Sequence, residues 1–569
     1  MKNIGLILLI LLATGICAQE NPVEIANQDS QAFAAVLPDS LNTQPSVIDS
    51  LKENIDPKLL LTEMNNFLDE KRKMEVEFFI PQLIYNENFH LSSPFNLNVH
   101  IKKNGFSEIP FSIGNLQIIQ NNQNIYNTTF KRGNVFYNSF GYSLPVAITE
   151  TYMGLGDIDM NNISVSLMKG GILGIPKLSM QLDFLGEKGK WLGYEDEASQ
   201  NLHLNLCYDF GFLNVQFNSS FIDQTLPGEK DIFSYQYPFN SIINKEKEYS
   251  VTFENKIIDL GLKYKLDNYE LVELFNKDRD LIQAIAKKRF QTINHLINFS
   301  YEFVSEDIVI DDFSNSDTTL TVFSENYSHI LSGDHESNIL GFNIGNTGYY
   351  QDENNFQFDS EISKYIFKGF GIFGEYNTSS NEYSPNYLQS FLRFETRSRI
   401  GGGILFDPSF FKSKITIGKH IIEGFEGGYF DVKNELEFML SDNLELDFKL
   451  WLRNERTTII SVNDEFLKAY PEWQMLDNFE LIYHLKYDNA IKLGLKHTYH
   501  SNFSYTLDDL DMIFTNDTNN IDAYLKIQLT NRFEISLDAI NLTNNPIMFI
   551  NSDHPGTHFN FNVHWIFAN

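Results

Sequence analysis

The sequence predicts an all-β protein: an antiparallel transmembrane β-barrel with an even strand number of about 16–22, and a small N-terminal segment. Three observations support this prediction. Apolar residues alternate with polar ones from Val76 almost to the end of the 569-residue chain. The alternating runs are about ten residues long, which is the length of a tilted membrane strand. Short and long connections between the runs also alternate, as they do in outer-membrane barrels.

Individual runs show the two faces of such a strand. In NLHLNLCYDF (201–210), Leu and Tyr alternate with His, Asn, Cys and Asp, and LELDFKLWLR (444–453) and FEISLDAINL (533–542) repeat the pattern. Strands of soluble sandwiches are shorter, at about five or six residues, so the length favours a membrane barrel. The polar positions supply the expected lumen-facing residues, which are of mixed charge: Asp183, Asp209, Lys449, Arg453, Lys486, Lys492, Lys526 and Asp538.

The chain ends on a strand with one apolar face, in HFNFNVHWIFAN (558–569). This face would meet lipid, and we expect the barrel-assembly machinery to recognise the strand that carries it. Its residues are Phe559, Phe561, Val563, Trp565 and Phe567. Upstream, tight turns are expected at 441–443, 488–489 and 530–532, and long connections at 457–477, 501–520 and 543–557.

The order of segments follows from the N-terminus and from the start of the alternation. Lys2 followed by an apolar run at 4–13 is typical of a secretory signal, which together with the barrel pattern predicts the outer membrane of a Gram-negative bacterium. The spacing of apolar residues at 269–290 predicts a helical insert in a loop. The expected segments are a signal peptide at 1–18, a flexible lead at 19–56, a short amphipathic helix at 57–73, a plug-like or periplasmic cap segment at 76–160, and the barrel at 161–569.

Composition and net charge limit the classes of molecule that the protein can bind. The chain has 43 Lys and Arg against 75 Asp and Glu, a net charge of −32. Nucleic acid is therefore disfavoured as a partner, because phosphate binding needs a basic face. The chain has 2 cysteines, of which Cys17 lies in the signal, so Cys207 has no partner for a disulfide. The expected partners are outer-membrane lipid, the barrel-assembly machinery and a small solute.

The short motifs that could indicate a catalytic, cofactor or metal site are each incomplete. GFGIFG (369–374) matches G-x-G-x-x-G, but a polar loop follows it, so we interpret its glycines, like those at 401–403, as strand glycines. The aspartates at 508–517 lack the spacing of an EF-hand, and the His-Glu pair at 335–336 lacks the second His of a zinc protease. We therefore expect no catalytic, cofactor-binding or metal site and no enzyme. A Ser, His and acid catalyst spread over different strands is the alternative that one sequence leaves open.

The end of the chain resembles the end of a TonB-dependent receptor barrel. Asn541-Leu542-Thr543 matches the close of the penultimate strand in that family, Pro555-Gly556-Thr557 matches a Pro-Gly-Arg with Thr in place of Arg, and the aromatic last strand follows. Residues 144–171 resemble the close of the family's plug domain. The segment at 76–160 is shorter than a full plug, and NPVEIAN (21–27) is the nearest match to a TonB box.

The resemblance implies a large receptor-type barrel that passes or imports a solute, with a reduced plug and TonB-type energy coupling as a further implication. Two alternatives remain open. One is a passive porin, and the other is a non-transporting surface-binding or structural barrel.

Overall fold

The barrel dominates the computed structural model of the protein. The described residues all belong to one compact unit. They are 89–91, 100–107, 112–113, 116–120, 127–131, 134–139, 142–156, 161–190, 196–226, 242–271, 275–312, 320–352, 355–383, 393–408, 411–422, 428–456, 459–462, 465–468, 473–486, 489–501, 504–507, 511–514, 517–544, 548–549, 552–553 and 557–568. The expected signal peptide, lead, amphipathic helix and TonB-box match lie outside these residues.

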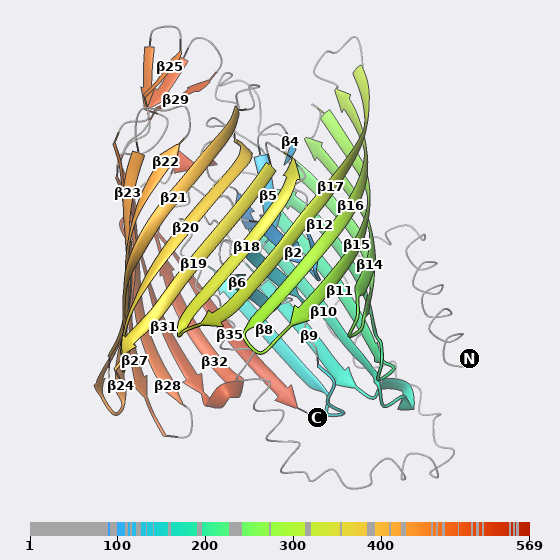
Figure 1. Ribbon diagram of the computed structural model, residues 1–569, viewed down its shortest axis with the longest axis horizontal. Coiled ribbons are helices and arrows are strands. Elements are labelled where there is room, and N and C mark those ends of the chain that lie inside the picture. The colour runs from blue at the N-terminus through green and yellow to red at the C-terminus, as the bar shows by residue number, and fades with distance from the viewer. Residues whose placement is uncertain are drawn as a thin grey trace. The chain divides into compact units, whose positions relative to one another are not determined.

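Twenty-two antiparallel strands pair in chain order and close into a barrel (Figure 1), as the sequence predicts. The last strand, β35, pairs with the first, β8, and so closes the ring. The strands are β8 Ile148–Gly156, β9 Asn161–Gly170, β10 Leu178–Lys190, β11 Asp196–Asp209, β12 Asn214–Leu226, β13 Ile242–Glu254, β14 Asp259–Leu271, β15 Phe275–Gln291, β16 His295–Asp312, β17 Leu320–Ile339, β18 Phe342–Asp352, β19 Asn355–Phe367, β20 Phe370–Tyr383, β21 Arg393–Phe406, β22 Phe411–Ile422, β23 Gly428–Ser441, β24 Leu444–Arg456, β27 Trp473–His484, β28 Ala490–His500, β31 Thr518–Leu529, β32 Phe533–Ile540 and β35 His558–Ala568.

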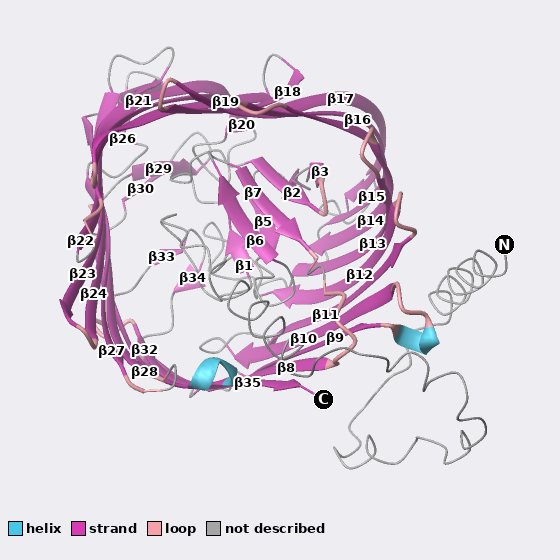
Figure 2. Ribbon diagram, turned by 60° about the horizontal axis from the view of Figure 1, so that its bottom comes forward, coloured by secondary structure: helices cyan, strands magenta, loops and turns pink. Residues whose placement is uncertain are grey.

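Smaller elements lie outside this ladder. Seven short strands precede β8 and form two small sheets, ordered β1-β5-β4 and β3-β2-β7-β6. Strands β2, β3, β6 and β7 lie within the ring of barrel strands (Figure 2). The elements are β1 Phe89–Leu91, β2 His100–Lys103, β3 Phe106–Ser107, β4 Ser112–Ile113, β5 Leu116–Gln120, β6 Asn127–Lys131, β7 Asn134–Asn138, η1 Ile172–Gly174, β25 Ile459–Val462, β26 Glu465–Lys468, β29 Ser504–Leu507, β30 Asp511–Phe514, η3 Thr530–Arg532, β33 Met548–Phe549 and β34 Ser552–Asp553.

The two ends of the barrel differ in their connections. At one end β23 and β24 are joined by two residues, and η3 joins β31 to β32. At the other end the connections after β24, β28 and β32 are long and carry the hairpins β25–β26, β29–β30 and β33–β34. We call these ends the short-turn rim and the long-loop rim. Among the described residues, no helix combines the length and apolar character needed to cross a membrane.

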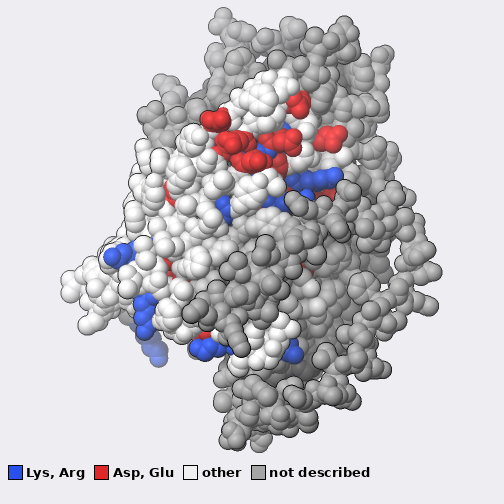
Figure 3. All heavy atoms as spheres, turned by 90° about the vertical axis from the view of Figure 1, so that its right-hand side faces the viewer, with Lys and Arg blue, Asp and Glu red and all other residues white. Residues whose placement is uncertain are grey.

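Alternation along each strand separates an apolar outer face from a polar lumen. On β11, Leu202 is 46% exposed, whereas His203 and Asn205 are buried. On β35, Phe559, Phe561 and Trp565 are exposed on the outer face. Outward acids occur towards the long-loop rim, where Figure 3 shows Asp and Glu gathered beside a largely uncharged surface. An uncharged band below charged strand ends is what a bilayer requires.

Two details of the last strand are explained by its neighbours. Ile566 interrupts the polar face of β35, and it is 4% exposed because it packs with Tyr142, Ile148 and Met168. His564, on the same inward face, lies with its Nε2 2.8 Å from Glu150 Oε1 on β8. The seam of the barrel therefore has both an apolar and a polar side-chain contact.

The helical insert expected at 269–290 is wrong. The stretch contains the end of β14 and most of β15, which is 17 residues long. The apolar residues of this stretch imitate helical spacing because they occupy both faces of β15. Ile282 is outward and 48% exposed, while Leu281 is buried on the lumen side against Val304 and Ile330. The barrel also begins at Ile148, before the expected residue 161, because β8 supplies the closing strand.

Charge on the outer face should cost far more than charge in the lumen. Leu495 is outward on β28 and 46% exposed, whereas Glu445 lies on the inward face of β24, two residues from Asp447, which is opposite Glu437. Leu495→Arg should destabilise the folded barrel by roughly 2–4 kcal/mol, the cost of an arginine on the lipid face near mid-membrane. Glu445→Arg should cost little, because it places a cation beside these acids in the lumen. The free energy of unfolding of both variants can be measured by urea titration in lipid vesicles, with the folded fraction read from the gel mobility of unheated samples. Equal losses of stability in the two variants would contradict the assignment of outward and inward faces.

Candidate functional site

A tight hairpin of the N-terminal segment reaches the lumen wall. Strands β2 and β3 are joined by Asn104 and Gly105, whose φ angles are 48° and 88°. Two positive φ angles are the mark of the Asn-Gly turns that suit a two-residue hairpin. The nearest atoms to a Cβ at Gly105 belong to the flexible end of Lys287 on β15, so it is the positive φ that favours glycine here. We call β2, the turn and β3 the lumen hairpin.

The aromatic ring of the lumen hairpin fills a pocket in the barrel wall. Phe106 is 0% exposed. A Cβ placed on Gly261 of β14 would lie 2.7 Å from Phe106 Cζ, so the missing side chain makes the space for the ring. The same Cβ would lie 2.8 Å from Ile285 Cγ2, and Lys263 Nζ lies 5.5 Å from the centre of the Phe106 ring. Burying a Phe side chain contributes roughly 1.5–3 kcal/mol.

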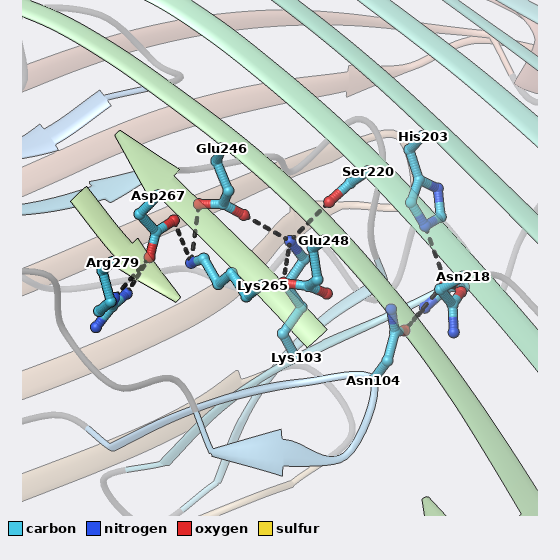
Figure 4. Close-up of polar contacts among 11 residues, drawn as sticks. Lys103, Asn104, His203, Asn218, Ser220, Glu246, Glu248, Lys265, Asp267 and Arg279 are labelled. Carbon is cyan, nitrogen blue, oxygen red and sulfur yellow. Dashed lines mark hydrogen bonds and ion pairs between the residues drawn. The ribbon is translucent and has the colours of Figure 1, made fainter. Parts of the chain in front are cut away.

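Beside this pocket, Lys103 joins the hairpin to two acids of β13. Its Nζ lies 3.2 Å from Glu248 Oε2 and 3.5 Å from Glu246 Oε1. It also lies 3.4 Å from Ser220 Oγ on β12. Lys103 is 8% exposed and Glu248 is 2% exposed, so the charge is compensated almost without solvent. Figure 4 shows the side chains of Glu246, Glu248 and Ser220 directed towards this ammonium.

The charge alternation continues along the wall away from the hairpin. Lys265 Nζ on β14 lies 2.9 Å from Glu246 Oε2 and 3.5 Å from Asp267 Oδ1. Arg279 on β15 pairs with Asp267 and, at 3.2 Å, with Glu306 on β16. Lys103, Lys265 and Arg279 thus each have an acid beside them, and Figure 4 shows Lys103 and Lys265 on either side of Glu246.

Two serines complete the attachment. Ser107 donates its backbone N–H to Glu302 Oε2 at 2.9 Å and its hydroxyl to Glu302 Oε1 at 2.7 Å. The hydroxyl of Ser139, just after β7, donates to Asn218 Oδ1 at 2.9 Å, and it lies 3.5 Å from His203 Nε2. Asn104 Oδ1 accepts the backbone N–H of Ser139, which ties the hairpin turn to the end of β7.

These contacts determine the position of the docked segment more than they increase the stability of the barrel. A buried ion pair gains little over an apolar pair of the same size, but removing one partner is costly, at about 3–5 kcal/mol. The wall from β11 to β16 therefore accepts this hairpin in one register. The arrangement is a docking site for the N-terminal segment.

The expected lumen-facing residues are spread around the barrel. Asp183 and Asp538 face the lumen, where Asp183 Oδ2 lies 3.0 Å from His203 Nδ1 and Asp538 accepts a hydrogen bond from Asn562. Lys449, Lys492 and Lys526 lie on β24, β28 and β31. Asp183 is linked to the docking site through His203, whose Nε2 lies 3.5 Å from Ser139 Oγ.

The other residues expected in the lumen lie at the ends of strands, or have a side chain outside the described residues. Asp209 ends β11 and is about half exposed, with its Oδ2 3.9 Å from Lys177 Nζ. Lys486 follows β27 in a turn and is exposed. Arg453 is opposite Asp431 in the ladder, and its side chain lies outside the described residues. The sequence prediction missed Lys103, Phe106 and their wall partners; the signal that could have found them is KNGF, an Asn-Gly turn followed by an aromatic residue.

The glycines of the two glycine-rich stretches lie in barrel strands and in one turn. Gly371 and Gly374 lie inside strand β20, which continues to Tyr383. Gly369 lies in the turn before β20 with a φ of 79°, so its interpretation as a strand glycine is wrong. Gly401, Gly402 and Gly403 lie inside β21. Among the described residues, no three His, Cys, Asp or Glu side chains gather closely enough to hold a metal ion.

Comparison with known proteins supports the fold. No protein-family model and no curated protein matches the sequence. Among solved structures, the siderophore receptor PirA from Acinetobacter baumannii is similar with a TM-score of 0.61 at 10% identity, over 83% of this chain and 90% of that one. The FrpB iron transporter from Neisseria meningitidis gives 0.62 at 8% identity, over 83% and 92%. BauA, the ferric preacinetobactin receptor from Acinetobacter baumannii, gives 0.59 at 10% identity, over 86% and 92%.

At these identities the likeness concerns the fold. The predicted resemblance to a TonB-dependent receptor barrel is confirmed at that level, and the similar proteins are receptors and transporters.

Filling the Phe106 pocket should release the lumen hairpin. Gly261→Val places a methyl-bearing carbon where the ring lies, and Phe106→Ala removes the ring without touching the barrel. Both should make the N-terminal segment sensitive to limited proteolysis while the barrel keeps its unheated gel mobility. Gly348→Val is the matched control, because the nearest atoms to its Cβ are 3.9 Å away. A segment that stays protected in both variants would show that the pocket does not hold it.

Proposed function

We propose that the protein is an outer-membrane barrel that passes or imports a small solute, with residues 76–160 acting as a reduced plug. The observation that carries this proposal is the lumen hairpin, whose Phe106 and Lys103 are buried against inward-facing residues of β12–β14. A barrel of 22 strands is wide enough to need a plug if it is not to leave an open channel. A segment that is docked by buried contacts inside such a barrel is suited to narrowing it.

The similar solved structures suggest where to look for the solute. They include a siderophore receptor, an iron transporter and a ferric preacinetobactin receptor. A chelated metal is therefore the first solute class to test. In this proposal the outer face contacts outer-membrane lipid, the last strand is the part that the barrel-assembly machinery recognises, and a TonB-type protein would act on the N-terminal segment.

Conductance tests the proposal. The described contacts of the lumen hairpin run along β12–β16, so we expect the full chain to conduct ions weakly in a planar bilayer. Deleting 19–141 keeps β8 and the closing seam and should raise the conductance, because the docked segment no longer occupies the lumen.

The outcomes separate the alternatives. Equal, high conductance of both forms would favour a passive porin over a plugged barrel. If neither form conducts, the transport proposal is wrong and a surface-binding or structural barrel becomes the better account. Retained unheated mobility of the deletion variant is the control that the ring still closes.

A further inference from the structure

A row of exposed apolar side chains lies on one arc of the short-turn rim. The turns of this arc join β9 to β10, β11 to β12, β13 to β14, β15 to β16 and β17 to β18. Their apolar tips, each at least 74% exposed, are Leu173, Phe212, Ile257, Ile293 and Leu340. One exposed leucine is ordinary on a protein surface, whereas such a row along one arc indicates a surface that contacts another molecule.

The turns on the other arc of the same rim have polar tips. There the exposed apolar residues stop before the tip of the turn, at Leu440, Leu485 and Leu529. The turn between the two arcs, after β19, has Lys368 at its tip next to the exposed Phe367. The tips after β21, β23, β27 and β31 are Asp407, Asp442, Lys486 and Thr530. Apolar tips are therefore a property of the β9–β18 arc rather than of short turns in general.

The backbone shows that the turns themselves do not require leucine. Leu340 and Gly341 connect β17 to β18 with φ angles of 53° and 79°. The lumen hairpin turns with a similar pair of angles, 48° and 88°, and its residues are Asn104 and Gly105. Asn suits this left-handed conformation and leucine adopts it at a cost, yet Leu173 also has a φ of 54°. A leucine that is both strained and exposed is explained by a contact outside the chain.

The apolar tips continue the outer face of the barrel. On β11, Tyr208 belongs by alternation to the same face as the outward Leu202. The ring centres of Tyr208 and Phe210 are 4.4 Å apart, and those of Phe210 and Phe212 are 6.4 Å apart. This aromatic row runs from the strand into the turn. Because the row is continuous with the membrane-facing surface, the molecule that covers it is lipid.

Exposed cations lie beside the apolar tips. Lys288, on the outward face of β15, has its Nζ 4.9 Å from the centre of the Phe290 ring. The acids near these turns, Asp209, Glu254 and Asp259, belong by alternation to the inward face. Figure 3 shows Lys and Arg side chains near the lower end of this side of the barrel, where the short turns lie. The exposed cations are Lys169, Lys177, Lys256, Lys288 and Arg289. Cations next to apolar side chains suit a phospholipid leaflet, whose phosphates are anionic.

We propose that the turns of the β9–β18 arc insert their apolar tips into the phospholipid leaflet that meets the short-turn rim, while the turns of the other arc remain in water. This inference rests on the proposed function for placing the barrel in an outer membrane. The same arc carries the lumen hairpin on its inner side, where Lys103 and Ser107 contact β13 and β16. The leaflet therefore anchors the wall on which the N-terminal segment docks.

Spin labels on matched turns test this proposal. Leu340 and Asp442 are each the first residue of a two-residue connection, so Leu340→Cys and Asp442→Cys place a label at equivalent positions on the two arcs. Ile293→Cys adds a second apolar tip. Each variant, with Cys207 replaced by Ser, carries a nitroxide and is placed in nanodiscs of phosphatidylethanolamine and phosphatidylglycerol. Oxygen concentrates in lipid and a nickel chelate stays in water. We expect oxygen to relax the labels at 293 and 340 severalfold more than the nickel chelate does, and the reverse at 442.

The other outcomes overturn the proposal. Nickel access at 293 and 340 equal to that at 442 would show that these tips are in water, and a protein partner would then be the molecule to look for. A label at 442 that oxygen relaxes as strongly would show that the two arcs do not differ. Labels shielded from both reagents would show that the chain itself covers the tips.

The measurement involves neither a solute nor conductance. The transport proposal can therefore fail while this inference holds, and this inference can fail while transport stands. Retained unheated gel mobility of each labelled variant is the control that the barrel is folded.

Discussion

The pairing of β35 with β8 is the contact on which the rest of the structure depends. A backbone N–H or C=O left unpaired in lipid costs several kcal/mol, so a membrane sheet has to close. Nine residues of β35 face partners on β8, from Asn560 opposite Gly156 to Ala568 opposite Ile148. The segment before β8 is bound at the same seam, because Gly170 donates its N–H to Leu144 O at 2.7 Å. Closure therefore also fixes where the N-terminal segment enters the lumen.

Once the ring is closed, the lumen has two kinds of wall. From β11 to β16 the inward charges are paired with one another and with Lys103 of the lumen hairpin. On the wall from β20 to β23, Arg399 pairs with both Glu375 and Asp431. The proposed function rests on the first of these walls, because that wall holds the lumen hairpin.

The barrel was predictable from the sequence because it depends on a local rule. Alternation within ten residues fixes which side chains face outward, as Leu202 against His203 shows. The rule failed at β15, where Leu281 is apolar and faces the lumen, because packing against Val304 and Ile330 replaced the usual polar contact.

The site was not predictable, since it depends on contacts between residues far apart in the chain. Lys103 and Glu248 are 145 residues apart, and β3 has two residues, too few for any periodic signal. The pocket for Phe106 is marked in the sequence by a single glycine, Gly261, whose purpose is visible only once the hairpin is in place. Among the charged residues expected in the lumen whose side chains are described, Asp183 is linked to this site through His203.

The most direct measurement of the central claim is a cross-link between the N-terminal segment and the docking wall. With Cys207 replaced by Ser, cysteines at Ser139 and Asn218 would stand where Ser139 Oγ and Asn218 Oδ1 are 2.9 Å apart. A short thiol-specific cross-linker applied to the folded protein should join them and change the mobility of the boiled chain. Cysteines at Ser139 and Lys492, on β28 far around the ring, should not be joined. Efficient cross-linking of the first pair alone is the predicted result; no cross-link in the first pair, or equal yields in both, would contradict a segment docked on β11–β16.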